Sequence, residues 1–370
     1  MKTWIEIDAA ALRHNFRSLA RVAKPAQTMA VIKANAYGHG LLECATILKK
    51  ENVKWFGVDH IDEALALRKA GIKQNILVIG FTPVARLAQA AKDKISITVF
   101  NMNTLESLAK LKMKSRVHVP IETGLTREGM GGKELETALA FLDRHRSQIE
   151  LEGVHMHFAN IEDTKSRAYA DRQISEYKKV IGKLEEYKLY PKVKHTASTA
   201  ASILYSNTHF DLVRTGIGLY GLWPSEETRR RTGHRLTLKP VLSWKTIVAQ
   251  VKTVKKGTPV SYGLTERVRR DSRVAVLPIG YADGFDRVSN SKRGHALVNG
   301  KRCKVLGRVC MNMTMVDVTD AGLVRPEDEV VLIGRQRKEC ITAEELAGLG
   351  KTINYEIVTR INWDIPRCVI

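Results

Sequence analysis

The residue with the clearest chemical potential is Lys33, in the segment AVIKANAYGHG at residues 30–40. Side chains alternate along a strand, so Lys33 shares a face with Met29 and Val31, which we expect to be buried. A buried amine has a lowered pKa and becomes a nucleophile. A lone lysine at a strand end more often reaches into water, so the rest of the chain must decide between the two interpretations.

Other polar residues lie in or just after later apolar runs that are typical of strands. They are Tyr37, Thr123, Arg127, His155, His157, Ser198, Thr199 and Arg214. In a parallel barrel the carboxyl ends of all strands meet at one mouth. The sequence therefore predicts an amine, two guanidinium groups and several hydroxyls around one site.

The glycine-rich stretch at residues 216–221, GIGLYG, matches the GxGxxG pattern of dinucleotide-binding proteins. It follows a late strand, however, and no acidic residue lies about 20 positions further on, which argues against a dinucleotide site. The loops after the last strands of a barrel commonly bind phosphate through backbone N–H groups. We expect a phosphate group at this turn.

His155 and His157 are two residues apart and so share one face of a strand, a spacing that can bind a catalytic metal. His195 and Asp211 on later strands could complete the ligand set. A barrel metal hydrolase is therefore the alternative from a different class of enzyme. It leaves Lys33 and the glycine-rich turn without a role.

The elements that must position these residues follow a βα period. Eight β-rich apolar runs occur at residues 29–35, 55–58, 76–81, 95–100, 117–122, 153–159, 193–198 and 211–216. Most intervals hold an amphipathic helix, clearest over residues 171–187, where Ile174, Tyr177, Ile181, Leu184 and Tyr187 recur at spacings of three and four. This pattern predicts an α/β fold in which residues 1–235 form a (β/α)8 barrel of the TIM type.

Residues 236–370 show a different pattern, with short alternating strands and little helix. Asn299-Gly300 lies between two such strands and predicts a tight hairpin turn. We therefore expect a separate, mainly β C-terminal domain.

Composition limits the possible partners and compartment. The net charge of +21 is spread along the 370 residues without a recognisable nucleic-acid module, so we expect no nucleic-acid partner. No apolar stretch approaches the roughly 18 residues of a membrane span, and we expect no membrane association. The five cysteines lack CxxC spacing, which fits a reduced, cytoplasmic protein.

A nucleophilic lysine, nearby arginines and a phosphate-binding turn together describe a pyridoxal 5′-phosphate site. The chain resembles the bacterial alanine racemases, which belong to fold type III of the pyridoxal phosphate enzymes, throughout its length. The matching motifs are AVIKANAYGHG (30–40), VRTGIGLYG (213–221), VSYG (260–263), IGYADG (279–284), GRVCMNM (307–313) and INYE (353–356).

The resemblance implies racemisation of L-alanine and D-alanine, which supplies D-alanine for peptidoglycan, by a head-to-tail homodimer with shared active sites. Lys33 would carry the cofactor and act as the base on the D-alanine side. Tyr262, from the partner's β domain, would act on the L-alanine side. Arg214 would face the pyridine nitrogen, with His157 between Tyr262 and Arg214.

Further binding residues are implied in the same way. Those for the cofactor phosphate are Tyr37, Thr199, Gly216, Ile217 and Tyr355, and Ser198 is a further cofactor-binding residue. Arg127 would contact the cofactor's ring hydroxyl and, with Met311, Tyr281 and Tyr262, the substrate. Arg287 and Arg308 would line the substrate access corridor.

The chain departs from the family pattern at several positions. Pro120 stands where many members have a lysine, often carbamylated, that orients the ring-contacting arginine, so an anion such as chloride or another group must hold Arg127. Asn312 replaces an aspartate, and Ser198-Thr199 replaces Asn-Ser. These changes leave open a racemase of broader specificity, acting on serine or basic amino acids.

Overall fold

The computed structural model describes residues 1–370, apart from the side chain of Ser289, and the chain divides into two compact units. The barrel unit comprises Ala10–Ala36 and Cys44–Lys239. The β unit comprises Met1–Ala9, Tyr37–Glu43 and Pro240–Ile370. The chain thus passes between the units immediately after the Lys33 segment.

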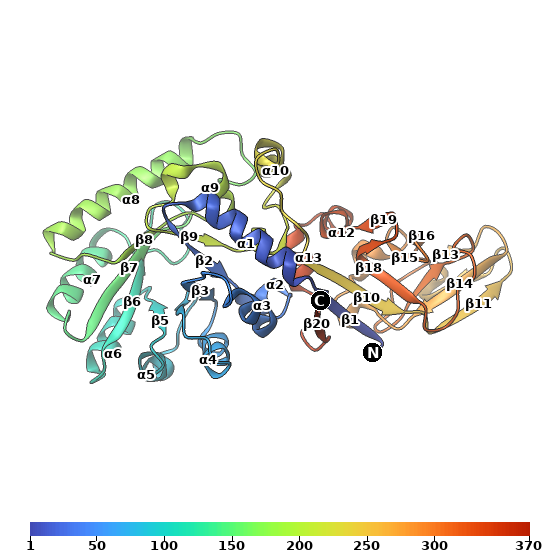
Figure 1. Cartoon of the computed structure of the whole chain (residues 1–370), viewed down its shortest axis with the longest axis horizontal. Helices are drawn as coiled ribbons and strands as arrows, with labels where there is room; N and C mark the ends of the chain where they lie inside the picture. The colour runs from blue at the N-terminus through green and yellow to red at the C-terminus, as the bar shows by residue number, and fades with distance from the viewer. The chain divides into compact units, whose positions relative to one another are not determined.

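The barrel unit is built on an eight-stranded parallel sheet in the order β8-β7-β6-β5-β4-β3-β2-β9 (Figure 1). The strands are β2 (Gln27–Val31), β3 (Trp55–Val58), β4 (Asn75–Val78), β5 (Ser96–Thr98), β6 (Ser115–Pro120), β7 (Ile149–His155), β8 (Val193–His195) and β9 (Leu212–Thr215). Backbone hydrogen bonds join the two end strands, from Asp211 N to Lys194 O (3.0 Å) and from Arg214 N to Ala197 O (2.8 Å). Each predicted run overlaps one of these strands, and the predicted barrel is confirmed.

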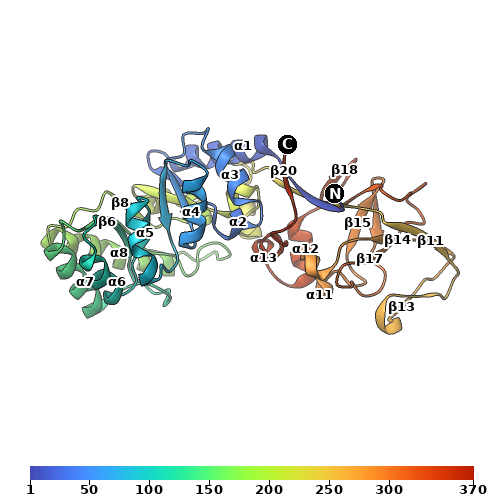
Figure 2. The ribbon, with the colours of Figure 1, turned by 90° about the horizontal axis from the view of Figure 1, so that it is seen from below.

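Helices surround these strands, as in the view of α5 to α8 in Figure 2. The helices are α1 (Ala9–Ala23), α3 (Leu41–Leu48), α4 (Ile61–Lys69), α5 (Leu87–Lys92), α6 (Met102–Lys110), α7 (Gly132–Arg144), α8 (Ala168–Glu186), α9 (Thr199–Leu204) and α10 (Glu226–Thr232). On α8 the predicted apolar stripe buries Ile174, Tyr177 and Leu184. Strands covered on both faces in this way are almost continuously apolar, as β3 is.

The main sheet of the β unit has the order β16-β15-β18-β10-β1-β20, with β19 paired to β18. Its strands are β1 (Thr3–Ile7), β10 (Leu242–Ile247), β15 (His295–Val298), β16 (Lys301–Lys304), β18 (Glu329–Gln336), β19 (Glu339–Ile341) and β20 (Arg367–Val369). Asn299 and Gly300 join β15 to β16 with φ of 52° and 75°, which confirms the predicted hairpin turn.

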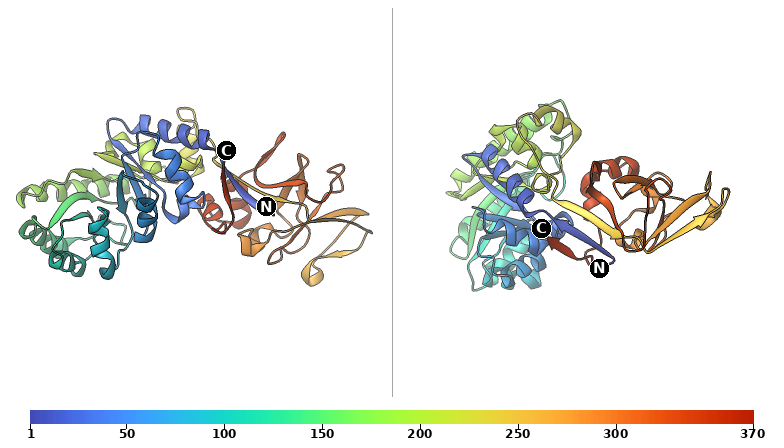
Figure 3. Two further views of the ribbon diagram at one scale, coloured as in Figure 1. Left: turned by 60° about the horizontal axis from the view of Figure 1, so that its bottom comes forward. Right: turned by 45° about the vertical axis from the view of Figure 1, so that its right-hand side comes forward.

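The first strand, β1, lies side by side with the last strand, β20 (Figure 3), and pairs antiparallel with β10. Ile5 and Ile7 of β1 are fully buried. The division predicted from the sequence placed residues 1–9 in the barrel, whereas the structure assigns them to the β unit. The physical reason is that β1 finds its hydrogen-bond partners more than 200 residues away along the chain.

Smaller elements complete the β unit. One sheet comprises β11 (Gln250–Val254), β14 (Ser272–Leu277) and β17 (Thr314–Asp317), and another comprises β12 (Pro259–Val260) and β13 (Glu266–Arg267). The helices are α11 (Arg287–Asn290), α12 (Ala343–Gly350) and α13 (Asn354–Thr359).

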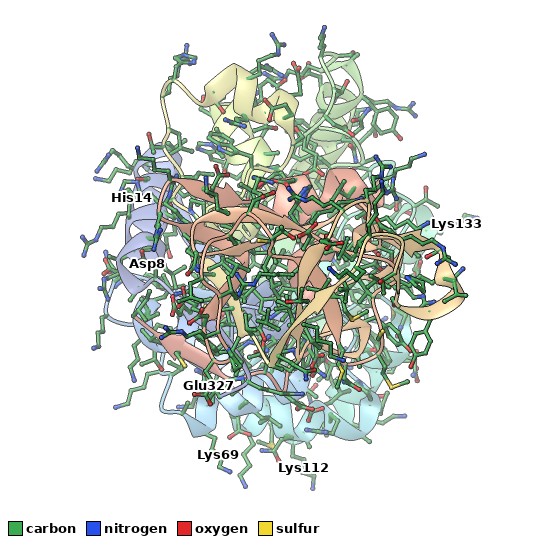
Figure 4. The ribbon with its side chains drawn as sticks, turned by 90° about the vertical axis from the view of Figure 1, so that its right-hand side faces the viewer. Asp8, His14, Lys69, Lys112, Lys133 and Glu327 are labelled. Atoms are coloured by element: carbon green, nitrogen blue, oxygen red, sulfur yellow. The ribbon has the colours of Figure 1, made fainter. Side chains whose placement is uncertain are left out.

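Positive charge is dispersed over the surface of the barrel unit. Figure 4 labels Lys69, Lys112 and Lys133, three exposed lysines that come from α4, from the segment after α6 and from α7. Among the helices that the structure describes, none combines the length and the hydrophobicity that a membrane span requires.

Candidate active site

Lys33 begins a single left-handed turn, labelled α2 (Lys33–Tyr37), that follows the end of β2. Ala34, Asn35 and Ala36 all have φ of 53°, a conformation that costs an L-residue about 1–2 kcal/mol. Two hydrogen bonds hold the turn, from Ala36 N to Ile32 O (2.8 Å) and from Asn35 N to the buried Glu63 Oε1 (3.0 Å). Strain that the surroundings enforce in this way is typical of functional sites.

The amine of Lys33 is accessible at the mouth of the barrel. Its Nζ lies 3.3 Å from Asp59 Oδ1, and its side chain is 38% exposed. The expectation that Lys33 is buried beside Met29 and Val31 is therefore wrong, because β2 ends at Val31 and the turn carries Lys33 past the end of the strand. An exposed amine at this position can be reached by a ligand.

Arg214, on β9, is the most firmly held cation of the site. Its guanidinium donates to the carbonyl oxygens of His195 (2.8 Å), Met156 (2.8 Å) and Thr196 (3.0 Å). It also lies 2.8 Å from His195 Nδ1 and 3.2 Å from His157 Nδ1. Burial lowers the pKa of Arg214 to about 10, so the group stays protonated at neutral pH.

His157 lies just past β7, close to several positive charges. Burial, followed by the charges of Arg214, Arg127 and Lys33, lowers the pKa of His157 to about 3. The imidazole is therefore neutral at pH 7. The three cations that lower its pKa are all predicted site residues.

Beneath this mouth, the barrel interior holds a row of buried histidines. His118 Nδ1 lies 2.8 Å from His195 Nε2, and His118 Nε2 lies 3.3 Å from Glu152 Oε2. The ring of His155 stacks on that of His195 at a centroid distance of 4.8 Å. The sequence analysis missed His118 and Glu152, although polar residues within the apolar runs of β6 and β7 were a signal that could have found them.

The histidine row does not support the metal hydrolase alternative. His155 is buried and its Nε2 has no hydrogen-bond partner, whereas His157 faces Arg214. Within the described part of the chain, no group of three or more His, Cys, Asp or Glu residues is placed to hold a metal ion. The ligand set that this alternative requires is not formed.

The glycine-rich turn and Thr199 lie together as predicted for a phosphate site. Thr199, the first residue of α9, accepts a hydrogen bond at Oγ1 from Gly216 N (3.0 Å). A β-carbon on Gly218 would lie 2.6 Å from Thr199 Cγ2, so only glycine fits there without a shift. Residues Ile217–Tyr220 form a short 3₁₀ turn, with Ser198 immediately before α9 on the facing segment.

The β unit gathers another group of predicted residues, which we call the Tyr262 cluster: Tyr262, Tyr281, Arg308 and Met311. Ser261 Oγ donates to Arg308 O (2.5 Å), and Tyr281 N donates to Cys310 O (3.1 Å). Both tyrosine loops therefore pack against the segment that carries Arg308 and Met311. Three separated sequence motifs thus form one surface, on which Tyr262 is 66% exposed and Met311 is 56% exposed.

Three more predicted residues lie elsewhere in the β unit. Arg287 Nη1 donates to Val309 O (2.8 Å), at the border of the Tyr262 cluster. Tyr37 and Tyr355 form a separate pair, with ring centroids 6.1 Å apart. Two residues predicted to bind phosphate from distant motifs are therefore neighbours.

Arg127 lies in the loop after β6 and pairs with Glu128, whose Oε1 is 2.6 Å from Arg127 Nη2. The sequence analysis did not identify Glu128 as a site residue. Pro120, the last residue of β6, lines the same cavity as Glu128, His155 and His157.

Comparison with known proteins identifies relatives over the full length of the chain. The family model "Alanine racemase, N-terminal domain" matches residues 7–224, and "Alanine racemase, C-terminal domain" matches residues 241–369. The alanine racemase of Carboxydothermus hydrogenoformans is 41% identical over 372 aligned residues, covering 99% of both chains. That of Methanococcus maripaludis is 37% identical, covering 98% of this chain and 97% of the relative.

Solved structures agree with the sequence comparison. The alanine racemase of Bacillus anthracis with bound L-Ala-P is 36% identical and superposes with a TM-score of 0.92, covering 100% of this chain and 95% of that one. The enzyme from D-cycloserine-producing Streptomyces lavendulae is 32% identical with a TM-score of 0.93, covering 100% of this chain and 97% of that one.

Proposed function

The chain belongs to the alanine racemase family, and from this premise we propose that Lys33 carries pyridoxal 5′-phosphate and that Lys33 and Tyr262 move the Cα proton of alanine. The protein is an isomerase that interconverts L-alanine and D-alanine. The observation that carries the proposed roles is the convergence of Lys33, Arg127 and Arg214 on His157 at the barrel mouth.

The chemistry of the barrel mouth fits this cofactor. An accessible amine such as that of Lys33 can bond to an aldehyde, and the two arginines supply positive charge for anionic groups. The glycine at 218 lets the backbone of the turn pack closely against Thr199, beside the proposed phosphate site. When bound, the cofactor supplies the electron withdrawal that makes the Cα proton acidic. Thr199, Gly216 and Ile217 of the barrel unit would hold its phosphate.

Two bases are needed because inversion at Cα removes a proton from one face and delivers a proton to the other. A single base would mostly return the starting enantiomer. In the proposed mechanism Lys33 holds or removes the proton on the D-alanine side, and the Tyr262 phenol does so on the L-alanine side. Met311 and Tyr281 would contact the substrate together with Arg127 and Tyr262, and Arg287 and Arg308 would line its access corridor.

Arg214 and His157 would support these steps without gaining or losing a proton themselves. Arg214 would face the cofactor's ring nitrogen, and a guanidinium with a pKa of about 10 keeps its own protons at neutral pH. Arg214 would therefore leave that nitrogen largely unprotonated, which would limit the electron withdrawal and suppress side reactions. His157, neutral at pH 7, would link Arg214 to Tyr262 through hydrogen bonds.

We propose that two copies associate head to tail, so that the Tyr262 cluster of one copy completes the barrel site of the other. The exposure of Tyr262 and Met311 supports this arrangement, because large apolar side chains grouped on a surface commonly mark an interface. None of the five cysteines forms a disulfide bond in the described structure, which fits a reduced compartment. We therefore propose action in the cytoplasm, supplying D-alanine for peptidoglycan.

The proposed role of Lys33 is tested with the purified protein saturated with pyridoxal phosphate. The Lys33→Ala variant should lose D-alanine formation by roughly a thousandfold or more, because the covalent carrier and one base are both removed. The exposed Lys69→Ala variant is the matched control and should keep full activity. Borohydride reduction followed by peptide mass mapping should place the cofactor on Lys33; an unmodified Lys33 in loaded protein would overturn the assignment.

Substrate breadth is tested by measuring rates on a panel of L-amino acids. We expect alanine to be the best substrate, because Tyr281 and Tyr355 would narrow the site. Faster racemisation of serine or of a basic amino acid would instead favour the broader-specificity racemase.

A further inference from the structure

The loop that carries Arg127 has a fixed backbone. Hydrogen bonds from Glu122 N to Met130 O (2.9 Å) and from Met130 N to Pro120 O (2.8 Å) close its base. The Glu122 carboxylate accepts from the backbone N–H of Thr126 (3.0 Å) inside the loop. A β-carbon on Gly129 would lie 2.6 Å from Glu122 Cα, so the loop packs tightly against its own base.

Within this loop, the side chains of Arg127 and Glu128 form a two-pronged ion pair. Arg127 Nη2 donates to Glu128 Oε1 (2.6 Å) and Arg127 Nε donates to Glu128 Oε2. The Glu128 side chain is 18% exposed and the Arg127 side chain is 57% exposed, so the carboxylate side of the pair is shielded from water and the guanidinium side faces it. A two-pronged pair fixes the plane of the guanidinium as well as its position.

The pair lies beside the cations of the proposed active site. The positive charge of Arg127 contributes to the lowered pKa of His157, and the negative charge of Glu128 raises the pKa of Arg214. Glu128 also lines one cavity with Pro120, His155 and His157. Glu128 is therefore close to Pro120, at the end of β6.

Pro120 offers no other way to hold Arg127. Pro120 has no polar side-chain atom. The cavity has a volume of about 10 Å³, the room of roughly one water molecule, and the carboxylate residues Glu122 and Glu128 both line it.

We propose that Glu128 is a positioning residue of this enzyme, whose carboxylate holds the Arg127 guanidinium in place for the substrate carboxylate and the cofactor's ring hydroxyl. The inference rests on the proposed function of Arg127. Because the carboxylate belongs to the chain itself, the arrangement requires neither carbon dioxide to form a carbamate nor chloride.

The test compares the full-length, cofactor-loaded Glu128→Gln variant with Glu136→Gln, which removes an exposed ion pair to Lys183 (2.9 Å) in the same unit. Glu128→Gln should raise the KM for alanine on the order of tenfold, with a smaller change in kcat, because Arg127 becomes free to move. The visible absorption maximum of its bound cofactor should also shift. Glu136→Gln should leave the KM and the spectrum unchanged.

Rescue separates positioning by charge from a general structural effect. Added formate should lower the KM of Glu128→Gln without affecting the wild type. Glu128→Asp keeps the charge with a shorter reach and should lose less affinity than Glu128→Gln; equal losses would contradict positioning by charge.

The inference is overturned if Glu128→Gln keeps the wild-type KM and spectrum. It is also overturned if chloride or bicarbonate lowers the KM of the wild type, because an external anion would then hold Arg127. Failure of the proposed function looks different, since the wild type itself would then form no D-alanine.

Discussion

At the residue scale, the barrel mouth is a region of positive potential. The charges of Arg214, Arg127 and Lys33 all lower the pKa of His157, and none of the three has a carboxylate partner that is fully buried with it. A phenol brought next to these charges would have a lowered pKa, because its anion is stabilised. The proposed role of Tyr262 as a base therefore relies on the positive charge at this mouth.

We expect the Tyr262→Phe variant to bind the cofactor normally but to remove the α-proton of L-alanine about 100- to 10,000-fold more slowly than the wild type. Removal from D-alanine should suffer less, because in the proposed mechanism Lys33 serves that side. Exchange of the α-deuterium, measured separately for each enantiomer, checks the asymmetry. Tyr190→Phe, at a tyrosine that is 74% exposed, is the control. Equal slowing of exchange from both enantiomers would contradict the two-base assignment.

At the scale of elements, the proposed site residues of the barrel unit lie in the segments that follow the strands. Lys33 lies in a left-handed turn after β2, Arg127 in a closed loop after β6, and Gly216 directly after β9. The strands fix where these segments begin, and hydrogen bonds such as that from Gly216 N to Thr199 Oγ1 fix their shape. A single methyl group added to the glycine-rich turn should therefore disturb its close packing against α9.

The Gly218→Ala variant tests this packing. Its new β-carbon would meet Thr199 Cγ2 at 2.6 Å, so we expect the free energy of unfolding to fall by about 1–3 kcal/mol and the affinity for the cofactor to fall with it. Gly182→Ala, on α8 with no atom within 4 Å of the added carbon, should instead raise the free energy of unfolding by up to about 1 kcal/mol. Urea unfolding of both variants measures the difference. A Gly218→Ala variant as stable as the wild type would show that Thr199 moves aside freely.

At the scale of the whole molecule, folding places four histidines of the barrel unit where their charged form is disfavoured. Burial lowers the pKa of His118, His155 and His195, and burial with nearby cations lowers that of His157 to about 3. In the unfolded chain these groups have a pKa of about 6.5. Below that pH the unfolded chain binds more protons than the folded chain, so acid favours unfolding.

We therefore expect the free energy of unfolding to be constant above about pH 6.5 and to fall as the pH is lowered, by up to about 1.4 kcal/mol per pH unit for each histidine. For His157 the fall continues to about pH 3. Urea unfolding at pH 7.5 and 5.5 measures it. His155→Phe should show a shallower dependence, whereas His234→Gln, at an exposed histidine, should match the wild type. An unchanged slope in His155→Phe would mean that His155 is protonated in the folded protein.

The sequence by itself determined the features that depend on neighbouring residues. The eight barrel strands follow from apolar runs, and the Asn299-Gly300 turn follows from its residue types. The motifs around Lys33, Gly216 and Tyr262 sufficed to identify the family, because each is a contiguous stretch of chain.

Only the tertiary structure decided the features that depend on distant partners. It placed β1 against β10 and β20, brought Lys33 past the end of its strand into an accessible position, and joined His118, His195 and Glu152 inside the barrel. It also showed that the Glu128 carboxylate pairs with Arg127, whereas Pro120 has no charged side chain. The physical reason is that periodicity reports which side of an element is buried, whereas the identity of the contacting group depends on how elements far apart in the chain pack together.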